Sequence, residues 1–166
     1  MVTQNITPVK LHHFDPNIPD YCTKCMEEVG TLLHCMWSCQ KLQIFWKEVL
    51  DLISKLTEKV VPVEAKICLL RIYPENFPVT VKKGKLINFC LLQAKRVIAL
   101  KWKEIQGPTL GQWITELSSN LALEKLTYMA KGKVEDFNKM WSSFLTFMNN
   151  LNVQPRTGQD LLPPPL

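Results

Sequence analysis

One cysteine and histidine spacing constrains this 166-residue chain more than any other feature. It reads C-x2-C-x8-H-x4-C and places Cys22, Cys25, His34 and Cys39 in order along the chain. Three sulfurs and one imidazole nitrogen are a complete set of donors for a structural Zn²⁺ ion, which takes four protein ligands in a tetrahedron. Two cysteines separated by two residues can bind one ion from a single tight turn. The spacing therefore predicts a CCHC zinc knuckle over residues 22–39.

Two alternatives remain open at the knuckle. The cysteines could form disulfides or serve as plain buried thiols. Disulfides need an oxidising compartment, however, and the first residues show no secretory leader, which would be a charged stretch followed by an apolar one. Cys35 could replace His34 as a ligand. We favour His34, because a histidine and a cysteine that bracket one helical turn are a commoner ligand pair than two cysteines four residues apart. Gly30 is expected to permit the backbone reversal between the two ligand pairs.

The positive charge of the chain lies in one span. Residues 66–105 hold nine Lys or Arg against two Glu, a net charge of +7, while the whole chain carries +5. Such a surface favours a polyanionic partner, nucleic acid before membrane. The longest apolar-rich run of this span, residues 86–94, has about half the length that a bilayer requires. We expect a protein of a reducing compartment, nuclear or cytoplasmic and not secreted, without a membrane partner.

The hydrophobic periodicity predicts a mainly α fold. Apolar residues recur at three- and four-residue intervals through residues 40–150, which should form a helical domain of about four to five helices. Thr109 and Gln112 form a capping box before one of these helices, and Gly132 is expected to end it. Residues 1–21 contain three prolines and are expected to be an extended lead-in without a helix. Residues 151–166 are expected to be a disordered, proline-rich tail.

The helix expected over residues 82–105 is both basic and apolar on most of its circumference, so it should be the central helix of the domain. Its cations either contact phosphate or only solvate a very apolar helix. Trp37 inside the knuckle could stack on a nucleobase or could supply core for the small metal site. The candidate nucleic-acid contacts are Trp37, Lys82, Lys83, Lys85, Lys95, Arg96, Lys101 and Lys103.

No reaction is indicated by the sequence. Glycine-rich phosphate loops, G-x-S-x-G and H-E-x-x-H are absent, and none of the five aspartates is adjacent to another. A zinc ion with four protein ligands also has no free position for a catalytic water. We therefore expect no catalytic residues and a structural zinc.

Several stretches carry a resemblance to a known family. CTKCMEEVGTLLHCMWSCQKLQIFWKEVLDLI, LINFCLLQAKRVIALKWK, PTLGQWITELSSNLALEKLTY and KVEDFNKMWSSFLTFM resemble the C-terminal zinc-knuckle region of reverse transcriptases from non-LTR (LINE-type) retrotransposons. The resemblance runs from about Thr7 to Met148. Its most specific part is the G-T-L-x-H-x-x-W-x-C core at residues 30–39, with the Phe45-Trp46 pair after it.

The resemblance implies a role in holding the RNA of a retroelement. It implies Cys22, Cys25, His34 and Cys39 as metal ligands, and it opposes Cys35, whose position is usually a plain apolar residue in that family. Thr23 departs from the family, which often carries an aromatic residue there. The chain also has no endonuclease part and no polymerase motif, so it looks like a C-terminal fragment with its own start methionine.

The sequence thus predicts a zinc-stabilised nucleic-acid-binding module, with RNA as the expected partner. Two alternatives remain: a helical protein-interaction or scaffold module, whose partner would be a polymerase part or another protein, and a retroelement fragment without function. An enzyme would need an open zinc site.

Overall fold

The computed structural model describes residues 6–153, and within that range the fold is mainly α with no strand. One isolated antiparallel bridge joins Tyr21 to Val29. The helical elements are α1 Pro8–Phe14, the π-helix η1 His34–Ser38, α2 Gln40–Thr57, α3 Ala65–Leu70, α4 Val81–Leu100, α5 Leu110–Ala130 and α6 Val134–Val153. The predicted fold class, a knuckle followed by a helical bundle, is confirmed.

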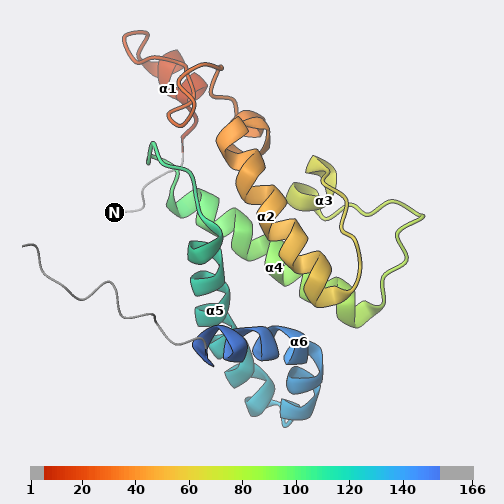
Figure 1. Ribbon diagram of the computed structural model, residues 1–166. Coiled ribbons are helices and arrows are strands. Elements are labelled where there is room, and N and C mark those ends of the chain that lie inside the picture. Colours follow the sequence, from red (N-terminus) through yellow and green to blue (C-terminus); the bar gives the residue numbers. More distant parts are fainter. Residues whose placement is uncertain (1–5, 154–166) are drawn as a thin grey trace, which may run out of the picture.

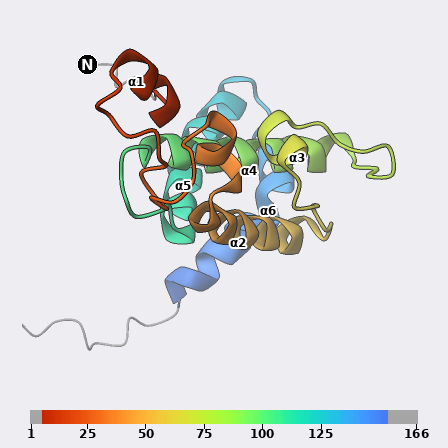
Figure 2. The same cartoon turned by 90° about the horizontal axis from the view of Figure 1, so that it is seen from above.

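Helix α4 lies at the centre of the bundle and packs against α2, α3, α5 and α6 (Figures 1 and 2). Its predicted core face is buried, since Ile87, Cys90, Ala94 and Ile98 are each 0% exposed. Trp113 of α5 packs on this face and its Nε1–H donates to the Cys90 carbonyl at 3.1 Å. The large aromatic side chains of α5 and α6 pack in the core as well, since Trp113, Phe137, Trp141 and Phe144 are buried.

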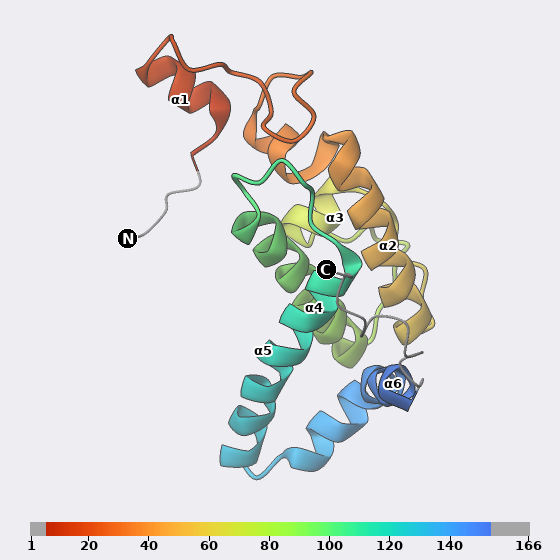
Figure 3. The same ribbon diagram turned by 60° about the vertical axis from the view of Figure 1, so that its left-hand side comes forward.

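The knuckle and the α5–α6 turn lie at opposite ends of the molecule (Figures 1 and 3). The capping box of α5 is present: Thr109 Oγ1 accepts from the Gln112 amide at 3.2 Å, and Gln112 Oε1 accepts from the Thr109 amide at 3.0 Å. Gly132 has a φ of +66° between α5 and α6, which is the predicted stop. None of the helices in the described range is both long and apolar enough to cross a membrane.

The structure corrects the expectation of a helix-free lead-in over residues 1–21. Pro8–Phe14 forms α1, with Thr7 as its N-cap accepting from the Lys10 amide at 3.4 Å. Pro8 takes a first-turn position, where its missing N–H leaves no helical hydrogen bond unmade.

Two helix ends also differ from expectation. Helix α4 ends at Leu100, so Lys101, Lys103 and Ile105 lie beyond it, and Ile105 is exposed rather than on the core face. Helix α6 continues to Val153, through the first residues of the expected tail. The rest of that tail, residues 154–166, lies outside the described range.

Candidate metal centre

Cys22, Cys25, His34 and Cys39 come together as the spacing predicts. One donor atom from each lies within 4.8 Å of the others, so the four residues could hold a metal ion. Cys22 Sγ is 3.9 Å from Cys39 Sγ, and Cys25 Sγ is 3.3 Å from His34 Nε2. A tetrahedral zinc ion with Zn–S bonds of ~2.3 Å would place two sulfurs ~3.8 Å apart. The Cys22–Cys39 separation matches this value, and the donor set as a whole is close enough to hold a tetrahedral ion.

The first ligand pair sits on a tight loop that its own backbone holds closed. The Cys22 amide donates to the Glu28 carbonyl at 2.8 Å, and the Met26 amide donates to the Cys22 carbonyl at 2.8 Å. Met26 has a φ of 60°, so it adopts the left-handed conformation that the turn requires. The reversal that we assigned to Gly30 is thus made by Met26, directly after the second cysteine.

Gly30 is needed for a different reason. A Cβ at this position would lie 2.5 Å from Cγ of Pro8, which is far inside van der Waals contact. The glycine therefore allows the first turn of α1 to pack directly on the knuckle backbone. The Gly30 amide also donates to the Asp20 carbonyl at 2.7 Å, which pairs the two sides of the loop.

The second ligand pair sits on the π-helix. His34 and Cys39 are five residues apart, which in an ordinary α-helix would separate their side chains by about 140° around the axis. In η1 the Cys39 amide instead donates to the His34 carbonyl at 3.1 Å, an i→i+5 bond that widens the turn. This wider turn returns Cys39 to the side of the helix that His34 occupies. The π-helix is the local structure that makes the H-x4-C spacing work.

The ring of His34 is oriented by residues on the side facing away from the ligand cluster. With Nε2 directed at the ligand cluster, Nδ1 lies 3.3 Å from Glu28 Oε2 and 3.5 Å from Ser38 Oγ. An Nδ1–H that donates to a carboxylate fixes the tautomer and leaves the Nε2 lone pair for a metal. Sequence reasoning missed Glu28, whose only signal was its place between the two ligand pairs.

The thiols of the cluster differ in acidity. Desolvation raises the pKa of Cys25, but the backbone amides of Glu27 and Glu28 and the His34 ring outweigh it and lower that pKa to about 7. Burial raises the pKa of Cys39 to about 11. A thiolate at Cys39 therefore needs a nearby cation, and a bound metal ion would supply one.

Cys35 is not part of the ligand group. It is buried beside the cluster, and its amide donates to the Thr31 carbonyl at 2.9 Å. Burial is the main reason that the pKa of Cys35 rises to about 12, and the neighbouring Cys22 raises it further. The geometry supports the choice of His34 over Cys35, and Cys35 is a core residue under the knuckle.

A buried lysine attaches the knuckle to the end of α4. Lys24 is 3% exposed, and its Nζ donates to the carbonyls of Lys101 at 2.7 Å, Trp102 at 3.2 Å and Glu104 at 3.1 Å. Three acceptors satisfy the three N–H groups of the ammonium. Burial lowers the Lys24 pKa, while the thiols of Cys22, Cys35 and Cys39 partly offset that effect. The three acceptor residues follow Leu100, the last residue of α4, so Lys24 connects the knuckle to the segment directly after that helix.

Trp37 packs against the bundle. Its ring centroid lies 5.5 Å from that of Trp46 in α2, and its carbonyl accepts from Gln43 Nε2 at 2.6 Å. The ring is half-buried. Packing is thus the use of Trp37 that the structure displays, and a stacking role at its exposed edge stays a prediction.

The basic residues singled out in the sequence fall into two groups. Lys95 Nζ donates to the Leu69 carbonyl at 2.9 Å, Arg96 pairs with Glu116 at 3.0 Å, and Lys101 pairs with Glu104 at 2.9 Å. The other group makes no ion pair within residues 6–153, and it consists of Lys82, Lys83, Lys85 and Lys103. Lys103 follows the end of α4, so it does not continue the basic surface formed by the lysines at the start of that helix.

Three further lysines approach the start of α4 from other helices: Lys131 and Lys133 at the α5–α6 turn and Lys139 in α6. This grouping is not indicated by the sequence, because the segment after residue 105 has no net charge. The described residues thus place a cysteine and histidine cluster at one end of α4 and a group of lysines at the other. No protein-family model matches this chain.

Proposed function

We propose that the chain is a zinc-stabilised module that binds nucleic acid, with RNA as its partner, and that it resembles the C-terminal segment of a LINE-type reverse transcriptase. The observation that carries this proposal is the cluster of Cys22, Cys25, His34 and Cys39, whose donor atoms lie within 4.8 Å of one another. The metal would hold the knuckle against the helical domain. The basic surface of that domain would then bind the nucleic acid.

Zinc is the metal that this donor set favours. Thiolate and imidazole donors in a tetrahedron suit Zn²⁺, whereas Mg²⁺ and Ca²⁺ require oxygen ligands and higher coordination numbers. Cys22, His34 and Cys39 are buried, which favours a closed structural site over one with an open position for water. The module is accordingly proposed as a binding protein and not as an enzyme.

The proposal of nucleic acid depends on charge. Residues 66–105 carry a net charge of +7, and five of their lysines form no ion pair within the described range, although Lys95 among them donates to the Leu69 carbonyl. Neutralising phosphates with such lysines releases counterions, so affinity should fall with salt. RNA is preferred over DNA only because of the family resemblance.

Metal content and RNA binding test the proposal together. Protein expressed with zinc should contain one zinc per chain by elemental analysis, and Cys39→Ser should lose it while Cys35→Ser, the matched control, retains it. A fluorescein-labelled 12-nucleotide U-rich RNA should bind the wild type with a log–log salt slope of several times −0.7. A wild type without metal, or without affinity for this RNA in 50 mM salt, would contradict the proposal.

One observation favours a protein-interaction module instead. The C-terminal half of α5 exposes Leu123, Leu126 and Met129, each by more than half of its surface. Exposed apolar residues on one helix can mark a protein contact. A chain that oligomerises in gel filtration and binds no RNA, and that becomes monomeric with Leu123→Ser and Leu126→Ser, would support this second function.

A further inference from the structure

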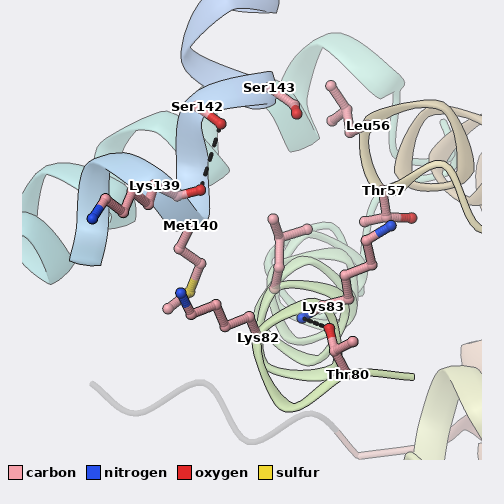
Figure 4. A pocket seen from close by; sticks show the side chains of 10 residues that line it. Leu56, Thr57, Thr80, Lys82, Lys83, Lys139, Met140, Ser142 and Ser143 are labelled. Atoms are coloured by element: carbon pink, nitrogen blue, oxygen red, sulfur yellow. Dashed lines mark hydrogen bonds between the residues drawn. The ribbon is translucent and has the colours of Figure 1, made fainter. Parts of the chain in front are cut away.

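The start of α4 borders a cavity that is rich in cations and hydroxyl groups. The cavity has a volume of about 240 Å³ and lies between the end of α2, the first turns of α4 and the middle of α6. Lys82 and Lys83 line it together with Thr80 and Ser142, and no acidic residue does. Figure 4 shows Lys83 extending toward Thr57 and Lys82 toward Met140, with Lys139 at the outer edge. The cavity thus offers ammonium and hydroxyl donors to an anion.

A second cavity of about 350 Å³ adjoins the first, and the two share Lys82 and Met140. Lysines from α4 and from the α5–α6 turn line it, namely Lys82, Lys85, Lys131 and Lys133. Glu124 and Asp136 line it as well. Taken together, the two cavities present six lysines and two carboxylates, so the surface around the start of α4 stays strongly positive.

A third cavity of about 410 Å³ adjoins the second, with which it shares Lys85, Glu124, Tyr128 and Met140. Its lining adds Arg71 and the rings of Phe89 and Trp141. The rings of Phe89 and Tyr128 are only partly buried. A surface on which cations are followed by partly exposed aromatic rings suits a single-stranded nucleic acid. In such a strand the phosphates and the unpaired bases are accessible at the same time.

The first turn of α4 is electrostatically unfavourable as it stands. Helix N-termini carry partial positive charge, and cations there are destabilising. Yet α4 begins with Lys82, Lys83 and Lys85, has no acidic residue in its first turn, and forms no ion pair through these lysines among the described residues. Thr80 caps the helix by accepting from the Lys83 amide at 3.3 Å. An external anion would relieve this repulsion.

We propose that the three adjoining cavities form one binding track for a single-stranded nucleic acid. Phosphates would bind to Lys82, Lys83 and Lys85 at the start of α4, and bases would stack at Phe89 and Tyr128. This proposal rests on the proposed nucleic-acid function and assigns its site. The track lies on the helical domain, at the other end of α4 from the metal centre, and it does not require Lys95, Arg96 or Lys101.

A charge-neutralised variant tests the track. In Lys82→Gln/Lys83→Gln/Lys85→Gln, the log–log salt slope for the labelled 12-nucleotide U-rich RNA should become shallower by about 2, since each lost phosphate contact on a single strand contributes about 0.7. The matched control is Lys10→Gln/Lys41→Gln/Lys47→Gln, three exposed lysines outside the three cavities. The control should keep the wild-type slope. Circular dichroism and thermal unfolding confirm that both variants are folded.

The outcomes separate the site from the function. A wild type that binds the RNA, with an unchanged slope in the track variant or an equal loss in the control, would overturn the track and leave nucleic-acid binding intact. Tighter binding of a duplex of the same length would overturn the single-strand assignment. A wild type that binds neither the single-stranded RNA nor the duplex would contradict the proposed function itself. Tyr128→Leu should weaken binding without changing the slope if bases stack there, and a changed slope would contradict that role.

Discussion

The two ends of α4 use lysine in opposite ways. Beyond its C-terminal end, Lys24 is 3% exposed and donates to three backbone carbonyls between Lys101 and Glu104. At its N-terminal end, Lys82, Lys83 and Lys85 border open cavities and make no ion pair within residues 6–153. Lysine is therefore a structural bridge at one end and, among the described residues, a cation without an ion-pair partner at the other.

The helix macrodipole makes this difference informative. A cation near a helix C-terminus is stabilising, because carbonyls without helical partners carry partial negative charge, and a cation near the N-terminus is destabilising. Lys24, which belongs to the knuckle, places its cation at the C-terminal end of α4, where a cation is favourable. The three lysines of α4 place theirs at the N-terminal end, where cations are unfavourable. Residues that oppose the stability of their own helix are expected where function requires them. The comparison thus separates the lysines that hold the fold from those available to a ligand.

Removal of the metal should give the largest effect and should act on only one end of α4. Chelation at neutral pH would leave the knuckle without its cross-link, and structural zinc contributes roughly 10 kcal/mol or more of apparent binding free energy in small domains. We expect hydrogen exchange to accelerate by orders of magnitude in residues 20–39 and 101–104, while Ile87 to Ala94 in the core of the bundle remain protected. Equal loss of protection at both places would show that the bundle cannot fold without the knuckle.

Replacement of the buried lysine should have the next largest effect. Lys24→Met keeps the aliphatic stem but removes three ammonium hydrogen bonds. The carbonyls of Lys101 and Trp102 keep a second donor each, from the Glu104 amide and Thr23 Oγ1, so we expect a loss of roughly 1–3 kcal/mol in unfolding free energy. Urea denaturation followed by circular dichroism measures it.

Lys10→Met is the matched control, because that lysine is exposed on α1 and its side chain has no partner in the described structure. Its unfolding free energy should stay within about 0.5 kcal/mol of the wild type. If Lys24→Met proved equally mild, Lys24 would not be the connection between the knuckle and α4.

The Cys and His cluster and most helices were predictable from the sequence because their determinants are local. The C-x2-C turn, the Thr109 capping box, Gly132 and the apolar periodicity of α2 and α4 each depend on residues a few positions apart. These signals placed the cluster and the central helix correctly.

What the sequence did not predict depends on contacts between distant segments. Lys24 reads as a surface lysine because its acceptors lie 77 to 80 positions away. Lys95 and Arg96 read as candidate phosphate contacts because Leu69 and Glu116, their partners, lie 26 and 20 positions away. Gly30 was assigned to a turn because only the folded chain brings Pro8 against it. In each case a tertiary partner determined the role of a residue whose local pattern was ambiguous.

The smallest predicted effect is a gain in unfolding free energy rather than a loss. Lys82→Gln and Lys83→Gln remove cations from the first turn of α4, where they oppose the macrodipole, so each should raise the unfolding free energy by about 0.3–1 kcal/mol at low salt. Lys103→Gln, beyond the other end of the helix, is the control and should give no gain. Thermal unfolding at 20 mM and at 500 mM salt would measure this, and the gain should shrink at high salt because exposed charges are screened. Stabilisation coupled to weaker RNA binding would show that these lysines are retained against the stability of the fold, whereas destabilisation would mean that they support it, as Lys24 does.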